Sequence, residues 1–292
     1  MPENKQGQIQ KEIAGSFQLW KTFAIEIFLF SLTIALGIIS ALKLEEILKI
    51  QKISLPRISF LEFFLYFSIA TLLLLFILYS PKINKKKKII LRIIFLAAVF
   101  SSGFTSLSLW VGDVTSLIVM VILIVFWLRK PTVFIHNLLV ILGIAGIGSL
   151  LGVRFEPLTL ALLLICFSIY DFIAVYKTKH MVKMAQEMVE TGTILALIIP
   201  PDILGFRENL NEVKPGGRFF ILGGGDIAFP LLLVTSLISQ GILDSVVVAI
   251  FALFGLLVSF SLFLNQKQRQ PIPALPPIAL FSIIGFIITF YL

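Results

Sequence analysis

Two stretches decide the fold of this chain: LLLICFSIYDFIAVY at 162–176 and FFILGGGDIAFPLLLV at 219–234, each an apolar run that carries one aspartate. A carboxylate in the interior of a membrane helix costs roughly 2.5–3.5 kcal/mol even on the lenient insertion scales. Charges in such a position are therefore rare, and they commonly mark a functional site. Asp171 and Asp226 are thus the most informative pair of residues in the sequence.

The composition indicates a membrane protein. Of the 292 residues, 58% are hydrophobic and 14% are charged, and the mean hydropathy is +1.03. A soluble domain carries about 25% charged residues. The apolar residues fall in long runs, as expected for helices that cross a bilayer. We therefore expect an all-α, polytopic membrane protein with about nine transmembrane helices, at roughly 18–42, 60–80, 89–110, 114–128, 132–151, 157–176, 219–239, 243–264 and 274–291.

The distribution of positive charge predicts the orientation. Cytoplasmic segments of membrane proteins are enriched in lysine and arginine, and most of the 24 such residues fall on one side if the N-terminus is cytoplasmic. We interpret the net charge of +8 as this topology signal, not as a nucleic-acid-binding surface. The chain is then one transmembrane domain, 1–292, whose C-terminus lies outside. Helices one to six cover about 18–176, a cytoplasmic loop covers 177–218, and helices seven to nine cover about 219–291.

This topology places the two aspartates at similar depth. Asp171 precedes the cytoplasmic Lys177 by roughly 9 Å, and Asp226 follows Arg218 by roughly 12 Å, at a helical rise of 1.5 Å per residue. Two carboxyl groups a few ångströms apart cannot both ionise cheaply, so the pair should share one proton, as in aspartic proteases. The alternative is that the aspartates only hydrogen-bond to neighbouring helices or tune their packing.

Three glycines, Gly223, Gly224 and Gly225, directly precede Asp226. A glycine in a helix interior costs roughly 0.5–1 kcal/mol relative to alanine, so three in succession need a reason. We interpret these glycines as allowing the backbone of another segment to lie close to Asp226. Tight helix packing is the alternative explanation.

A proline-rich segment, Pro271-Ile272-Pro273-Ala274-Leu275-Pro276-Pro277, opens the last predicted helix on the same side as the aspartates. Prolines are ordinary in the first turn of a helix, where no N–H partner is lost. The same prolines favour extended backbone at Ala274 and Leu275, which could bind an extended peptide.

The sequence gives little support for a metal site, a cofactor or a disulfide. The only histidines, His136 and His180, are far apart, so there is no HExxH zinc motif, and we predict neither a metal nor a cofactor. The single cysteine, Cys166, excludes an intrachain disulfide. Glu26 and Glu62 are charges in apolar surroundings, and we expect them to snorkel or to pair.

Three short motifs resemble the YD, GxGD and PAL motifs of the presenilin and signal peptide peptidase family: Tyr170-Asp171, Gly223-Gly224-Gly225-Asp226 and Pro273-Ala274-Leu275. They stand in the family's order, on predicted helices six, seven and nine. The resemblance implies an intramembrane aspartyl protease with Asp171 and Asp226 as its catalytic residues. It also implies that the remaining residues of the three motifs shape the site and help to seat the substrate.

Within that family the chain is most similar to the presenilin branch. Presenilins have a cytoplasmic N-terminus, as predicted here, and the runs YDFIAV and PALP are presenilin-like. The loop at 177–218 is shorter than in animal presenilins and has no obvious self-cleavage segment. The resemblance therefore implies a microbial homologue, in a prokaryotic plasma membrane, that acts as a single uncleaved chain without accessory subunits.

The predicted function is hydrolysis of peptide bonds within transmembrane segments of substrate proteins. The expected partners are those substrates, the lipid bilayer and a further copy of the chain in a homo-oligomer, but no nucleic acid. One alternative is an ion or proton transporter, or a leak channel, that uses the buried aspartates as a relay. Another is a scaffold that binds other membrane helices through Gly148 and Gly152.

The loop between the two aspartate-bearing helices contains two further candidate elements. HMVKMAQEMVE at 180–190 is amphipathic and could continue helix six beyond the membrane surface. The apolar stretch TILALIIPP at 193–201 could pair with an extended substrate as an added strand. On that hypothesis, deletion of 192–201 lowers cleavage and leaves the fold intact.

Overall fold

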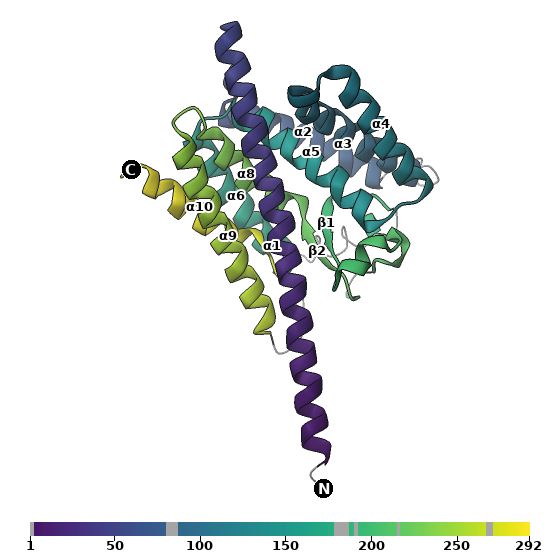
Figure 1. Ribbon diagram of the computed structural model, residues 1–292. Helices are drawn as coiled ribbons and strands as arrows, with labels where there is room; N and C mark the ends of the chain where they lie inside the picture. The colour runs from purple at the N-terminus through teal and green to yellow at the C-terminus, as the bar shows by residue number, and fades with distance from the viewer. Residues whose placement is uncertain (1–2, 80–86, 178–186, 190–191, 215–216, 267–270) are drawn as a thin grey trace.

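A computed structural model describes residues 3–79, 87–177, 187–189, 192–214, 217–266 and 271–292. The chain is mainly helical, as predicted, and contains one small sheet (Figure 1). Its helices and strands are α1 (Glu3–Gln51), α2 (Phe60–Tyr79), α3 (Lys87–Val111), α4 (Asp113–Arg129), α5 (Val133–Gly152), α6 (Pro157–Tyr176), β1 (Ala196–Ile199), η1 (Ile203–Arg207), η2 (Leu210–Glu212), β2 (Phe220–Gly223), α8 (Gly224–Ser236), α9 (Ile242–Leu264) and α10 (Leu275–Thr289).

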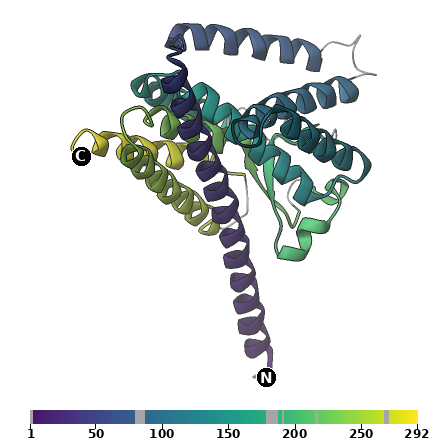
Figure 2. The same cartoon turned by 45° about the horizontal axis from the view of Figure 1, so that its top comes forward.

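Within the described ranges, five helices are long and apolar enough to cross a membrane: α3, α5, α6, α9 and the Leu19–Gln51 part of α1. Three shorter apolar helices accompany them, at Phe60–Leu73, in α8 and in α10. The exact count of about nine spans therefore stays a prediction. Helix α1 is longer than the expected 18–42, and its N-terminal part projects past the other elements (Figures 1 and 2).

Helix α5 lies at the centre of the bundle and packs against α1, α3 and α8. Its close approach to α8 depends on small residues. A Cβ on Gly148 would lie 2.3 Å from the side chain of Leu231, and a Cβ on Gly152 would lie 1.9 Å from Oγ1 of Thr235. Thr235 also donates a 2.7 Å hydrogen bond to the Gly148 carbonyl. Both glycines thus serve packing inside the chain, which argues against the scaffold alternative.

The sheet changes the predicted start of helix seven. Residues 219–239 were expected to be helical throughout, but β2 occupies Phe220–Gly223 and α8 begins only at Gly224. β2 pairs antiparallel with β1, in a register that puts Ala196 opposite Gly223. The aromatic and β-branched residues Phe220 and Ile221 fit a strand, which ends at the first glycine of the run, and Gly224 and Gly225 already belong to the first turn of α8.

The outer edge of β1 is covered by two side chains at the start of α5. The Asn137 amide donates to the Ile198 carbonyl at 2.7 Å, and its oxygen accepts from the Ile198 N–H at 2.9 Å. Nε2 of His136 lies 3.2 Å from the Ala196 carbonyl. Ile198 is fully buried. The apolar stretch at 193–201 therefore belongs to the core, so deleting 192–201 would disrupt the fold, contrary to the expectation from the sequence.

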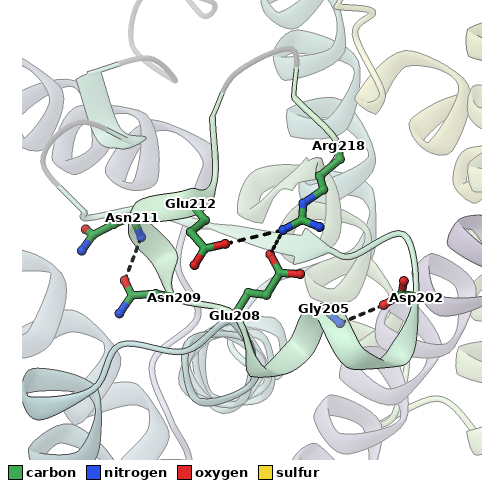
Figure 3. A network of polar contacts seen from close by, with 7 residues as sticks. All are labelled: Asp202, Gly205, Glu208, Asn209, Asn211, Glu212 and Arg218. Atoms are coloured by element: carbon green, nitrogen blue, oxygen red, sulfur yellow. Dashed lines mark hydrogen bonds and ion pairs between the residues drawn. The ribbon is translucent and has the colours of Figure 1, made fainter.

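The connection from β1 to β2 is folded by local polar contacts (Figure 3). Asp202 accepts a hydrogen bond from the backbone N–H of Gly205 at 2.9 Å, which caps η1. The Arg218 guanidinium pairs with Glu208 and lies 3.5 Å from a carboxylate oxygen of Glu212. These contacts hold the connection next to the start of β2. Most of the amphipathic stretch predicted at 180–190 lies outside the described residues.

Candidate active site

Helices α6 and α8 meet through a pair of stacked rings. The Phe167 and Phe229 centroids are 4.2 Å apart. Phe167 precedes Asp171 by four residues and Phe229 follows Asp226 by three, so each ring lies about one turn from its aspartate on the same helix face. The stack therefore brings the two aspartate-bearing faces together.

Asp171 is only 4% exposed, and its side chain connects α6 to the start of α10. Its Oδ2 accepts a hydrogen bond from the backbone N–H of Leu275 at 3.3 Å. The proline-rich segment is thus in contact with the first aspartate, but its backbone differs from the expectation. Ala274 has helical dihedral angles (φ −85°, ψ −29°) and α10 begins at Leu275, so neither residue is extended. Prolines at the next two positions fit the first turn of a helix.

Asp226 is 8% exposed and lies in the first turn of α8, where the helix dipole favours negative charge. A Cβ on Gly223 would lie 2.9 Å from Oδ2 of Asp226, so this glycine leaves room for the carboxylate.

The other two glycines of the run differ from each other. The N–H of Gly224 donates to the Leu195 carbonyl at 2.9 Å, and a Cβ on Gly224 would lie 2.8 Å from that oxygen. A partner backbone does approach this glycine closely, as the sequence suggested. The nearest atom to a Cβ on Gly225 belongs to the Phe229 ring, at 3.6 Å, which is an ordinary contact.

The remaining motif residues lie at different distances from the pair. Pro273 is buried and Ala274 is half-buried, both beside Leu275. Tyr170 is exposed on α6, although it directly precedes Asp171. The structure thus joins the PAL segment to Asp171 and the glycine run to Asp226.

A third carboxyl group lies in this region. Glu26 on α1 is 8% exposed, and its Oε2 has no hydrogen-bond partner among the residues that the structure describes. Phe23, three residues earlier, stacks on Phe260 at 4.1 Å, and Phe260 also contacts Phe220 of β2 at 6.5 Å. Phe23 and Glu26 lie three residues apart and share one face of α1, so Glu26 is on the side of α1 that faces Phe260. The burial of Glu26 contradicts the expected snorkelling, and its position in an apolar run was the signal in the sequence.

Glu62 has an ordinary structural role. Its carboxylate accepts from the backbone N–H of Ser59 at 2.9 Å, and its own N–H donates to the Ser59 hydroxyl at 3.2 Å. This reciprocal pair is a capping box at the start of α2. Across the described ranges, no three His, Cys, Asp or Glu side chains cluster in a way that could hold a metal ion.

Comparison with known proteins relates the chain to one family and to solved structures that share its fold. The family model described as "Signal-peptide peptidase, presenilin aspartyl protease" matches residues 25–292. No curated protein matches the sequence. Among solved structures, a presenilin family intramembrane aspartate protease in a C222 crystal is 22% identical with a TM-score of 0.60, covering 92% of this chain and 98% of that one. A P2 crystal structure described in the same words is 24% identical with a TM-score of 0.56, covering 90% and 96%. At these identities, the likeness to the solved structures shows a shared fold.

Proposed function

Because the chain belongs to the signal-peptide peptidase and presenilin aspartyl protease family, we propose that Asp171 and Asp226 are the catalytic pair of an intramembrane aspartyl protease. Its substrates are transmembrane segments of other proteins. One observation carries the residue assignment: two buried carboxyl groups lie on helix faces that the Phe167–Phe229 stack joins.

The chemistry needs only the two carboxyl groups and water. One carboxylate takes a proton from a water molecule as the oxygen of that water attacks the scissile carbonyl carbon. The other, protonated, carboxyl group donates its proton to the carbonyl oxygen. The tetrahedral intermediate then breaks the C–N bond, and the amine leaves with a proton from the pair. The Leu275 N–H and the N-terminus of α8 hold the two carboxyl groups in place through this cycle.

The edge of β2 is the proposed seat for an extended substrate. The N–H and C=O of Ile198 point to Asn137, away from β2. Its pairing partner, Ile221, must therefore point its own N–H and C=O away from β1, because paired residues of an antiparallel ladder alternate together. An added strand at this edge runs toward Gly223 and Asp226. This proposal replaces β1 by β2 as the strand that pairs with substrate.

We further propose the orientation that the charge distribution predicts, with the N-terminus cytoplasmic, the C-terminus outside and the membrane a prokaryotic plasma membrane. The chain acts uncleaved. A homo-oligomer stays a prediction. Neither the described residues nor the comparisons favour the ion-relay alternative.

The proposal is tested with detergent-purified protein and a single-span substrate whose products are mapped by mass spectrometry. Asp171→Asn and Asp226→Asn keep the side-chain shape and should each lower cleavage within the span by about 100-fold or more. Asp113→Asn, in the exposed first turn of α4, is the matched control and should leave cleavage unchanged. Equal products from all variants would show that a contaminant cuts the substrate. Ion flux in liposomes that depends on either aspartate, without products, would favour the relay.

A further inference from the structure

A cavity of about 830 Å³ lies between α1, α5 and η1. Its wall is apolar over most of its length, with Phe28 and Leu32 contributed by α1 and Leu138 and Ile141 by α5. From Thr132 at one end to Ile141, the α5 side of the cavity is roughly 14 Å long at 1.5 Å per residue.

The end of the cavity next to Thr132 is positively charged. Lys130 and Arg207 line it, and both side chains are exposed. Within the described part of the chain, no acidic side chain lines the cavity, and neither Lys130 nor Arg207 forms an ion pair. The cavity thus has one cationic end and a long apolar body.

Exposed apolar side chains in its lining indicate that the cavity opens toward the bilayer. Phe28 on α1 and Phe134 on α5 form part of its lining, and both are largely exposed. At membrane depth the molecules available to fill such a groove are lipids and the helices of other proteins. By the proposed orientation the cationic end faces the cytoplasm, where transmembrane helices carry their own lysines and arginines. Like charges therefore disfavour a protein helix here, whereas an anionic headgroup complements them.

We infer that this cavity binds an anionic phospholipid, with an acyl chain along Leu32, Leu138 and Ile141 and the phosphate-bearing headgroup between Lys130 and Arg207. Basic pockets between transmembrane helices on the cytoplasmic side bind such headgroups. Zwitterionic phosphatidylcholine fits the same apolar wall but brings a cation to the positive end. The inference concerns binding, and it can fail or hold independently of the proposed proteolysis.

Asn137 links the cavity to the candidate site. It lines the cavity, and its amide group holds both backbone groups of Ile198 in β1. A lipid in the cavity shields these hydrogen bonds from competing water. Bound anionic lipid should therefore also raise the thermal stability of the protein, a readout that needs no substrate.

The test uses the full chain in mild detergent, incubated with equal amounts of dioleoylphosphatidylglycerol and dioleoylphosphatidylcholine, with native mass spectrometry to count bound lipids. Each cation near a membrane surface strengthens anionic lipid binding about five-fold, so we expect a preference of roughly 25-fold. Lys130→Gln with Arg207→Gln should abolish it. Lys88→Gln with Lys214→Gln removes two exposed cations that do not line the cavity and should keep the preference.

A second variant tests the apolar part of the cavity. Ala24 is exposed and lines the groove, so Ala24→Trp fills it without changing the charge. This variant should lose retained lipids of both kinds. Three results would each overturn the inference: equal retention of the two lipids by the unaltered protein, a preference that survives Lys130→Gln with Arg207→Gln, or a preference that disappears in the control double variant. Full retention by Ala24→Trp would place the lipid elsewhere.

Discussion

Phe167 and Phe229 stack with ring centroids 4.2 Å apart and planes inclined by 22°, and each lies one helical turn from an aspartate of the candidate pair. This contact packs α6 against α8 about one helical turn from the two carboxyl groups. The position of one aspartate relative to the other therefore depends on two side chains that take no part in the chemistry.

Phe167→Ala should lower kcat by about 10- to 100-fold, because a displacement of about 1 Å between reacting groups has that effect. Phe229→Ala should give a similar loss. The double variant should lose little more than either single one, because each change removes the same stack. Leu162→Ala, exposed on α6, is the control. Additive losses in the double variant would contradict this role for the stack.

The glycines before Asp226 should differ in their tolerance of alanine. Gly223→Ala places a methyl group 2.9 Å from Oδ2 of Asp226 and must displace the carboxylate, so we expect a loss of cleavage of about 10-fold or more. Gly225→Ala meets only the Phe229 ring at 3.6 Å and should lose much less. The two variants are compared by cleavage rate at matched folded fraction. The reverse order of losses would contradict the proposed role of Gly223.

Asn137 should be important for stability. Asn137→Leu keeps a similar shape but leaves the N–H and C=O of buried Ile198 without their partners, which should cost about 2–4 kcal/mol. The midpoint of thermal unfolding in detergent should fall by roughly 5–10 °C. Asn211→Leu changes an exposed residue and should have little effect. An unchanged midpoint for Asn137→Leu would mean that water replaces the amide.

Glu26 should reduce the stability of the protein. The buried Oε2 atom of Glu26 has no hydrogen-bond partner among the described residues, which is costly, so Glu26→Leu should stabilise the fold by about 1–3 kcal/mol. The midpoint of thermal unfolding should rise for Glu26→Leu and fall for Glu62→Leu. Glu62 caps α2, and its loss should destabilise the protein. A lower midpoint for Glu26→Leu would reveal a partner for this carboxyl group.

Most of the helical architecture could be predicted from the sequence, because long apolar runs have few alternatives to helix within a membrane. The two aspartates and the motifs around them were also apparent, because a charge or a glycine run stands out against apolar neighbours. The start of α8 was predicted wrongly. Phe220–Gly223 is as apolar as a helix segment, and its strand conformation depends on pairing with Ala196–Ile199.

The sequence by itself thus determined that the chain is a mainly helical membrane protein, and which two carboxylates and which short motifs to consider. Tertiary structure alone decided which of these residues meet. The Leu275 N–H reaches Asp171 across more than a hundred residues, and Asn137 holds Ile198 across 61. Glu26 lies buried within the bundle rather than at the surface. Such contacts depend on how helices that are distant in the chain pack together. Local hydrophobic patterns predict the helices but not which of them pack against each other.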